Sequence, residues 1–338
     1  MRPCLRAPKM LRMLLCSAVF KISSHSCRSF LLILNLIHYF YKKQESFHQV
    51  KVTYLMSNFF IEKYASALQL SSLQNPKVKQ VLHLRDKSER DETKRFIIEG
   101  VRELLHATEA KHAVEALFIC PDLFLDNNEE SLIARILAEH PHCALYICTE
   151  PVFRKFSYRD RPDGLLAIAP QKHLHLNDLE RLLQTKQSPF LIVAEAIEKP
   201  GNLGTILRSS DAVGLDALIV CDRCTDIHNP NVVRASVGTL FTVPVVEAEG
   251  KQTLNWLKSQ GIAILAATPS ATLEFTEVDM TQPLAIAVGT EQLGLSDYWM
   301  ENATLQVKIP MNGVADSLNV AMATTLLLYE ALRQRTKK

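Results

Sequence analysis

Three segments in the second half of the chain combine polar side chains with glycines in patterns that suit a ligand site. Residues 195–214 read EAIEKPGNLGTILRSSDAVG, and residues 286–296 read IAVGTEQLGLS. Residues 309–333 run from an apolar strand end, through a Pro-Met-Asn-Gly loop, into a helix rich in Ala, Thr and Leu. Polar side chains at the start of such a helix lie where backbone N–H groups are unpaired and can hold a ligand.

The first segment carries two residues whose types suit chemistry, Asn202 and Arg208. Asn202 precedes an expected helix, so N-capping alone would account for it. Arg208 lies about two turns into that helix, which should pack on a sheet; it either extends to solvent, pairs with Asp211 or serves a site. Gly201 and Gly204 allow another backbone to approach closely.

The other two segments place candidates at a strand end and at a helix start. Gly289 follows the strand AIAV, and a glycine there lets a ligand approach the backbone where open α/β sheets bind ligands. Ser317 suits an N-cap. An N-cap role should not account for Asn319, two residues later, which therefore favours a site.

Taken in order, the three segments resemble the three motifs of the SpoU/TrmH branch of the SPOUT superfamily. These are S-adenosylmethionine-dependent RNA ribose 2′-O-methyltransferases with a trefoil-knotted α/β domain, and the resemblance covers residues 190–335. It implies a catalytic set and a set that contacts the cofactor mainly through backbone atoms. The catalytic set is Asn202, Arg208, Glu291, Ser317 and Asn319; the cofactor set is Thr268, Gly289, Ile309 and Leu318.

One part of the second motif departs from the family pattern. Many members have Gly after the motif's Glu, whereas this chain has Gln292 and Leu293, so the loop is expected to differ in shape. The resemblance also implies a homodimer and a preceding domain, similar to ribosomal protein L30e, that binds the RNA substrate.

Basic residues supply the candidates for RNA contact. Between residues 77 and 95 they are interrupted by acidic ones, which is typical of a solvated surface with ion pairs but also allows a phosphate-binding edge. Arg159 and Arg234 have the same two interpretations. With the resemblance, we favour RNA contact for six residues: Lys79, Arg85, Lys87, Arg90, Arg159 and Arg234.

The overall charge restricts how nucleic acid can bind. Residues 1–44 hold eight Lys or Arg and no acidic residue, and the remaining residues hold 30 basic and 36 acidic residues, a formal net charge of −6. RNA affinity must therefore come from a local basic patch.

The eight cysteines include one pair with ligand-like spacing, Cys221 and Cys224. A single CxxC is weak evidence for zinc, and this pair ends an apolar run, so buried thiols in a reduced, cytosolic protein are the favoured interpretation. No metal site is expected.

Residues 1–55 match nothing in the family and receive no function. Their densest apolar run, residues 30–40, is too short to span a bilayer. The basic composition of residues 1–44, which hold no acidic residue, is typical of an organellar transit peptide, but we favour Met56 as the true start. The predicted organisation is an extension at 1–55, an L30e-like domain at 56–169, a linker at 170–188 and a methyltransferase domain at 189–338.

Alternating apolar strands and helices should position these candidates. The first domain reads as a small α/β sandwich with a charged loop after its first helix. In the second, strands are expected at 190–196, 217–221, 243–247, 262–267, 284–288 and 305–309, and helices near 203–213, 231–239, 251–259 and 318–334. This pattern predicts a mainly parallel sheet covered on both faces.

The predicted function is methylation of a ribose 2′-hydroxyl in structured RNA, with guanosine of 23S ribosomal RNA favoured. Transfer RNA as substrate, and an RNA-binding protein without catalysis, remain alternatives. A dinucleotide-binding enzyme is disfavoured because no GxGxxG or phosphate-binding loop opens a helix. DNA and membranes are not expected partners.

Overall fold

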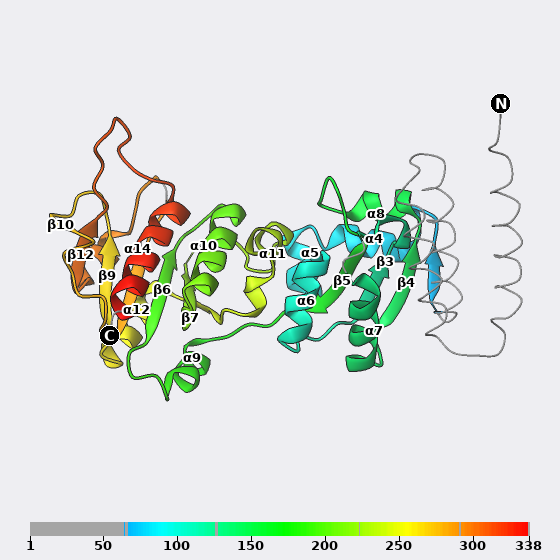
Figure 1. Ribbon diagram of the computed structural model, residues 1–338, viewed down its shortest axis with the longest axis horizontal. Helices are drawn as coiled ribbons and strands as arrows, with labels where there is room; N and C mark the ends of the chain where they lie inside the picture. The colour runs from blue at the N-terminus through cyan, green and yellow to red at the C-terminus, as the bar shows by residue number, and fades with distance from the viewer. Residues whose placement is uncertain (1–63, 65–66, 126–127, 223, 291, 337–338) are drawn as a thin grey trace, which may run out of the picture. The chain divides into compact units, whose positions relative to one another are not determined.

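The computed structural model describes residue 64 and residues 67–125, 128–222, 224–290 and 292–336 (Figure 1). The expected extension at 1–55 and the catalytic candidate Glu291 lie outside these residues. In the described part of the chain, no helix is long and apolar enough to cross a membrane.

The first half of the described chain forms a five-stranded mixed sheet with the strand order β1-β4-β3-β5-β2. Strands β1, β4 and β3 are parallel, whereas β5 runs antiparallel to both β3 and β2. The elements are β1 (Leu68–Leu70), α4 (Pro76–His83), α5 (Lys87–Thr93), β2 (Arg95–Glu99), α6 (Val101–Glu109), β3 (Ala116–Ile119), η1 (Pro121–Leu123), α7 (Glu129–Glu139), β4 (Ala144–Cys148), α8 (Glu150–Phe156) and β5 (Leu165–Pro170).

The second half forms a seven-stranded sheet with the order β10-β12-β9-β11-β6-β7-β8, in which every pair of neighbours is parallel. Its elements are α9 (Leu176–Leu183), β6 (Phe190–Glu195), α10 (Pro200–Ala212), β7 (Ala217–Cys221), α11 (Pro230–Ser236), η2 (Thr239–Phe241), β8 (Val245–Ala248), α12 (Gly250–Ser259), β9 (Ala263–Ala267), β10 (Leu273–Glu274), β11 (Leu284–Val288), α13 (Asp297–Asn302), β12 (Leu305–Lys308) and α14 (Val320–Arg335).

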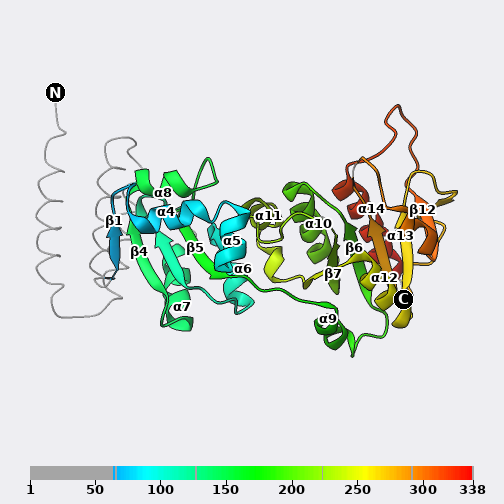
Figure 2. The same ribbon diagram turned by 180° about the vertical axis from the view of Figure 1, so that it is seen from behind.

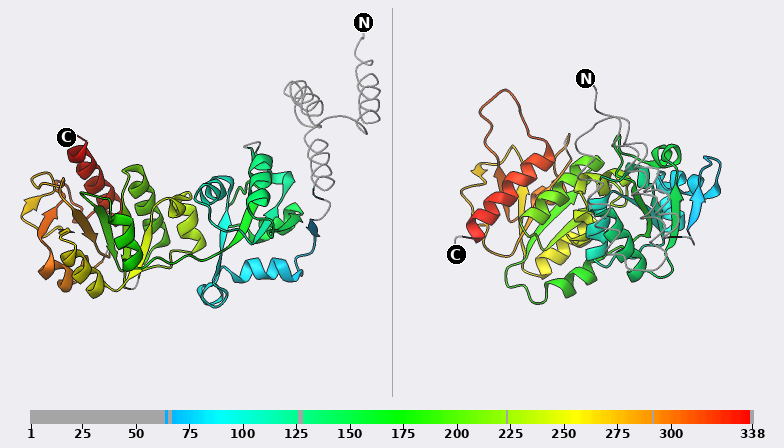
Figure 3. Two further views of the ribbon diagram at one scale, coloured as in Figure 1. Left: turned by 90° about the horizontal axis from the view of Figure 1, so that it is seen from below. Right: turned by 45° about the vertical axis from the view of Figure 1, so that its right-hand side comes forward.

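Helices cover both faces of this parallel sheet, as its continuous apolar strands require. Helices α10, α11 and α14 pack on one face, where Leu207, Val232 and Leu328 join one buried cluster. Helices α9, α12 and α13 cover the other, with Leu254 and Trp299 in a second cluster. Helices α10 and α14 lie side by side (Figures 1 and 3), and Figure 2 shows the same elements from behind. The mainly parallel α/β architecture is confirmed, while the trefoil knot stays a prediction.

Two expectations about local structure were wrong. Residues 87–93, expected as a charged loop, form helix α5, and the buried side chain of Arg90 anchors it. Helix α10 begins at Pro200, so Asn202 lies inside its first turn and Lys199 occupies the N-cap position. Strand β10 and helix α13 were not anticipated, because two residues and six residues carry too little periodic signal.

The described cysteines are free thiols, and burial raises their pKa values. Burial raises the pKa of Cys221 to about 12 and that of Cys224 to about 12. Cys221 is the last residue of β7, so the interpretation of buried thiols at a strand end is confirmed for it. No group of three or more metal-ligating side chains occurs among the described residues.

Gly204 allows α10 and α11 to pack closely. A Cβ atom on Gly204 would lie 2.4 Å from Cβ of Ala235 and 2.8 Å from the backbone nitrogen of Ser236. Backbone cannot move aside as a flexible side chain can, so this position requires glycine. Gly201, on the same helix, has nothing within 4 Å of its would-be Cβ.

We therefore expect opposite effects from the same substitution at these two glycines. Gly204→Ala should lower the free energy of unfolding by about 1–3 kcal/mol, because the added methyl overpacks the helix contact. The matched control Gly201→Ala should raise stability by roughly 0.5–1 kcal/mol through helix propensity. Urea unfolding followed by circular dichroism measures both, and equal effects would contradict the packing argument.

Candidate functional site

Three of the four cofactor candidates directly follow neighbouring strands. Thr268 comes directly after β9, Gly289 after β11 and Ile309 after β12. Strand β9 pairs in parallel with both β11 and β12, so the three residues meet at one edge of the sheet. This is the carboxyl edge, where open α/β sheets bind ligands.

The first and third motifs touch through their asparagines. The Asn319 side-chain nitrogen donates to the Asn202 side-chain oxygen at 3.1 Å, although the two residues are 117 positions apart. Asn202 lies in the first turn of α10, and Asn319 immediately precedes α14. The two helix starts are therefore joined at the site.

Asn319 is the N-cap of α14, so the expectation that an N-cap role could explain Ser317 but not Asn319 was wrong. The Asn319 side-chain oxygen accepts from the backbone N–H groups of Ala321 at 3.0 Å and Met322 at 3.4 Å. Ser317 lies two residues earlier on an exposed loop, where its hydroxyl donates to the Asp316 carboxylate at 3.3 Å. Both hydroxyl and amide groups are thus available beside the start of α14.

Arg208 lies on α10 with an exposed side chain. It is six residues beyond Asn202, a rise of about 9 Å along a helix axis. The adjacent Ser209 bonds to Thr325 of α14 at 2.7 Å between hydroxyl oxygens. Arg208 thus stands on the edge of the paired helices and faces solvent, where a substrate can reach it.

The second motif forms a compact turn after β11. The backbone N–H of Thr290 donates to the Gly294 carbonyl, and the N–H of Gly294 donates to the Thr290 carbonyl, each at 3.0 Å. A Cβ on Gly289 would lie 2.1 Å from the Gly294 carbonyl oxygen. Only glycine fits at 289, because the Gly294 carbonyl occupies the space that a side chain would need.

Buried Glu195, the last residue of β6, contacts the end of this turn and was not singled out from the sequence. Its carboxylate accepts the backbone N–H of Ser296 at 2.8 Å and the Ser296 hydroxyl at 2.6 Å. The signal that was available is a charged residue ending the otherwise apolar strand FLIVAE.

The cofactor candidates fit S-adenosylmethionine. Gly289 offers backbone without a side chain, Thr268 a hydroxyl, and Leu318, 38% exposed, an apolar surface. Such a set suits a ligand with an apolar purine face and several polar groups, since ligand sites combine apolar walls with few placed polar atoms.

Two of the six RNA candidates are engaged in ion pairs inside the protein. Arg90 is 1% exposed, and its guanidinium donates to the Asp226 carboxylate at 2.7 and 2.8 Å and to two carbonyls. Arg159 pairs with Glu103 and Asp163 at 2.6 and 3.0 Å. Burial raises the pKa of Glu103, although Arg159 acts against this rise. Both guanidinium groups are therefore committed to contacts within the protein.

The other four RNA candidates are more accessible. Lys79 and Lys87 are exposed, and Lys87 pairs with Asp91 on α5. Arg85 stacks over the Tyr158 ring, 4.5 Å from its centre, and donates to the Ser157 carbonyl. The exposed Arg234 donates to the Tyr158 carbonyl at 3.2 Å. Arg85 and Arg234 therefore approach the same short segment.

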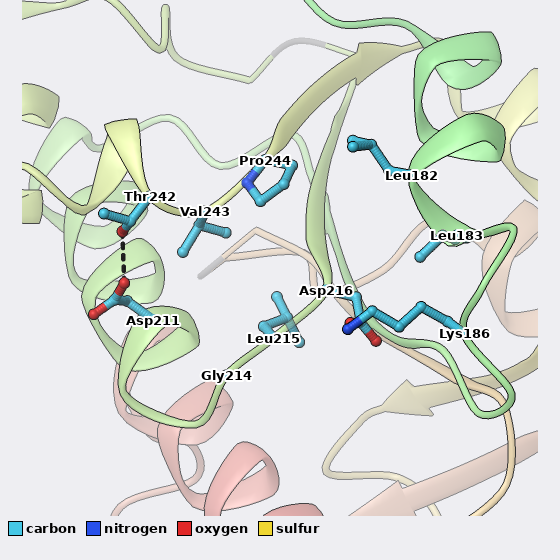
Figure 4. A pocket seen from close by; sticks show the side chains of 10 residues that line it. All are labelled: Leu182, Leu183, Lys186, Asp211, Gly214, Leu215, Asp216, Thr242, Val243 and Pro244. Carbon is cyan, nitrogen blue, oxygen red and sulfur yellow. Dashed lines mark hydrogen bonds and ion pairs between the residues drawn. The ribbon is translucent and has the colours of Figure 1, made fainter. Parts of the chain in front are cut away.

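A hollow of about 330 Å³ lies at the opposite edge of the parallel sheet (Figure 4). Asp216 directly precedes β7, and Pro244 directly precedes β8. Both line the hollow together with Leu183 and Lys186. None of the candidate site residues is among the ten that line this hollow. It is thus separate from the site at the carboxyl edge.

Comparisons with known proteins agree with this geometry. Residues 189–329 match the SpoU rRNA methylase family, and residues 75–167 match the MRM3-like substrate binding domain. A 23S rRNA (guanosine(2553)-2′-O)-methyltransferase of Bacillus subtilis, RlmP, is 30% identical over 77% of this chain and 98% of its own length.

Two solved structures are similar across most of the described chain. An RNA 2′-O ribose methyltransferase is 37% identical and has a TM-score of 0.70, with 80% of this chain and 100% of that chain covered. An AdoMet-bound rRNA methyltransferase of Sinorhizobium meliloti is 28% identical with a TM-score of 0.71, covering 79% and 98% of the two chains. The chain therefore belongs to the SpoU rRNA methylase family and is an S-adenosylmethionine-dependent methyltransferase.

Proposed function

We propose that this protein methylates a ribose 2′-hydroxyl in structured RNA, and that guanosine in 23S ribosomal RNA is its substrate. The observation that carries the proposal is the contact between Asn202 and Asn319, which joins the first and third motifs. Thr268, Gly289 and Ile309 follow β9, β11 and β12 at the carboxyl edge of the sheet. The named activity of the Bacillus relative supports the choice of ribosomal guanosine.

Bound S-adenosylmethionine supplies a methyl group already activated by its sulfonium. The protein must hold the ribose oxygen in line with that methyl and help the hydroxyl lose its proton. Positioning of this kind can supply roughly 7–11 kcal/mol in well-oriented cases. Asn202 and Asn319 suit this task because their side chains are hydrogen-bonded to each other and the Asn319 side chain also caps α14.

Arg208 is best suited to stabilise negative charge that develops on the ribose oxygen. A guanidinium stays protonated in proteins, so Arg208 is a poor general base. A fixed positive charge beside the developing alkoxide lowers the barrier electrostatically, and the proton then leaves to phosphate or water. We assign Glu291 and Ser317 to the same catalytic set, and Ile309 and Leu318 to cofactor contact through backbone atoms.

The RNA-binding surface is proposed to include Lys79, Lys87, Arg85 and Arg234. Among the described residues, Arg85 and Arg234 form no ion pair with a carboxylate, so their charges are available to phosphate. Arg90 and Arg159 are left out of this surface, because reaching RNA would break buried ion pairs. Since the 2′-hydroxyl distinguishes RNA from DNA, DNA is not a substrate.

Helix α14 supports the proposal of a homodimer. Met322, Leu326 and Tyr329 are 64%, 44% and 50% exposed, and their spacing puts them on one face of the helix. The opposite face is buried in the core through Leu327 and Leu328. An exposed apolar stripe on a helix at the site is typical of an interface between subunits. The free thiols further support a reducing, cytoplasmic location.

Mapping of 2′-O-methyl groups tests the reaction and its substrate together. Cells lacking the gene should lose one ribose methylation in large-subunit ribosomal RNA, and wild-type protein should restore it. Arg208→Ala should not restore it, because the rate falls by about 10²–10³-fold without the charge. The purified variant should still bind S-adenosylhomocysteine. A lost methylation in transfer RNA would overturn the ribosomal assignment, and near-normal single-turnover rates for Arg208→Ala would overturn its role.

Removal of the charge at Arg234 should weaken RNA binding independently of RNA sequence. We expect Arg234→Ala to reduce the salt dependence of log Kd by about one unit or less, as for one lost phosphate contact. Lys251→Ala, which removes an exposed charge on α12, is the matched control and should leave both quantities unchanged. Filter binding at several salt concentrations measures them, and equal effects of the two variants would contradict the assignment.

A charge in the apolar stripe of α14 should separate the subunits. Leu326→Glu should sediment as a monomer in analytical ultracentrifugation at concentrations where the wild type is dimeric, because burial of an unpaired carboxylate is unfavourable. Leu182→Glu, an equivalent change at a 48% exposed leucine of α9, should remain dimeric. A monomeric wild type, or a dimeric Leu326→Glu protein, would refute this interface.

A further inference from the structure

The Glu195 carboxylate accepts two hydrogen bonds from Ser296. The Glu195 carboxylate is 7% exposed, and each oxygen has its own donor: the Ser296 hydroxyl at 2.6 Å and the Ser296 backbone N–H at 2.8 Å. Hydrogen bonds to an ionised carboxylate are stronger than neutral ones. The contact joins the end of β6 to a loop 101 positions later in the chain.

The Ser296 hydroxyl is diverted from its usual local role. Ser296 occupies the N-cap position of α13, where serine commonly caps the helix with its side chain. No such side-chain cap forms here, because the hydroxyl turns to Glu195 instead. The bond therefore serves the link between the loop and β6 rather than the start of a six-residue helix.

The loop transmits this anchoring to Gly289. Reciprocal backbone bonds join Thr290 and Gly294, and the Leu293 N–H donates to the Thr290 hydroxyl at 3.0 Å. Gly289 lies directly against the backbone of Gly294. These contacts connect Ser296, through Gly294 and Thr290, to Gly289, so a fixed Ser296 also restrains Gly289 at the cofactor edge.

The other side of Glu195 leads to the first motif. Ala196 follows it with φ of 53°, a left-handed conformation that is unfavourable for a residue other than glycine. Strained backbone of this kind persists only where surrounding contacts enforce it. The chain then continues to Asn202. The Glu195 carboxylate therefore links the segment that carries Asn202 to the end of the second motif.

We propose that Glu195 is a positioning residue that holds Ser296, and through it Gly289, in the cofactor-binding arrangement. This rests on the proposed function for the identity of the site. Glu195 contacts neither ligand in this assignment; it acts through Ser296 on Gly289.

The test uses Glu195→Gln, Ser296→Ala and the double variant in the full chain. Glu195→Gln should weaken binding of S-adenosylhomocysteine by about 10- to 100-fold, as expected for a lost charge-assisted bond. Ser296→Ala, at an exposed position that does not threaten folding, should act in the same direction. Ser296→Thr, which keeps the hydroxyl, should retain more affinity, and the double variant should be little worse than Glu195→Gln.

A matched control separates positioning from stability. Glu129→Gln alters another buried carboxylate, which accepts the Leu125 N–H at 2.8 Å in the first domain. It should lower the melting temperature without changing affinity for S-adenosylhomocysteine or the single-turnover rate. The proposal fails if Glu195→Gln and Ser296→Ala behave like Glu129→Gln, or if their effects on affinity are additive.

The binding readout needs no RNA, so the proposal is tested even if the substrate assignment is wrong. A wild-type protein that binds S-adenosylhomocysteine but methylates no RNA would overturn the proposed function and leave the role of Glu195 measurable. A wild type that does not bind S-adenosylhomocysteine would overturn both.

Discussion

The parallel alignment of all seven strands in the second sheet determines where the chemistry lies. Parallel strands end at the same edge, so the loops that follow them meet even when they are far apart in sequence. Thr268, Gly289 and Ile309 reach one edge for this reason, each as the first residue after its strand. The hollow beside Asp216 and Pro244 lies at the amino edge and therefore collects a different, unrelated set of side chains.

The basic residues divide by their pairing, and pairing depends on the fold. Arg90 and Arg159 lose hydration and form ion pairs with carboxylates. Such buried pairs contribute little net stability but are costly to break. Arg85 and Arg234 instead hold the segment around Tyr158 through its ring and carbonyls and keep their charge uncompensated. In a chain whose residues after 44 are net acidic, these two uncompensated charges are the basis for the proposed phosphate contact.

The sequence predicted elements that have a strong period or strong end signals. The strands at 217–221 and 284–288 have the predicted bounds, because both are continuous apolar runs. The Asn75-Pro76 pair marks the start of α4, and Asn75 caps it as its type suggests. Helix α5 escaped prediction because its charged sequence has no apolar face; its stability comes from tertiary bonds of Arg90 that no local pattern reveals.

The same reasoning explains which parts of the site needed three dimensions. The resemblance supplied Asn202 and Asn319 as site residues, but their contact and the Glu195–Ser296 contact are tertiary and leave no mark in spacing. Glu195 was visible only as a charge at the end of an apolar strand. A buried carboxylate at such a position must find donors, and the donors can come from any loop that reaches the same edge.

The side-chain amide of Asn319 both caps a helix and contacts another candidate site residue. Its oxygen caps α14 through Ala321 and Met322, and its nitrogen donates to Asn202. Aspartate would cap equally well but has no donor, and serine has a shorter reach, so asparagine suits both tasks at once. Because the cap and the link use the same planar group, the orientation of Asn202 is tied to the start of α14. The helix that is proposed to form the dimer interface is therefore also proposed to set the geometry at the substrate oxygen.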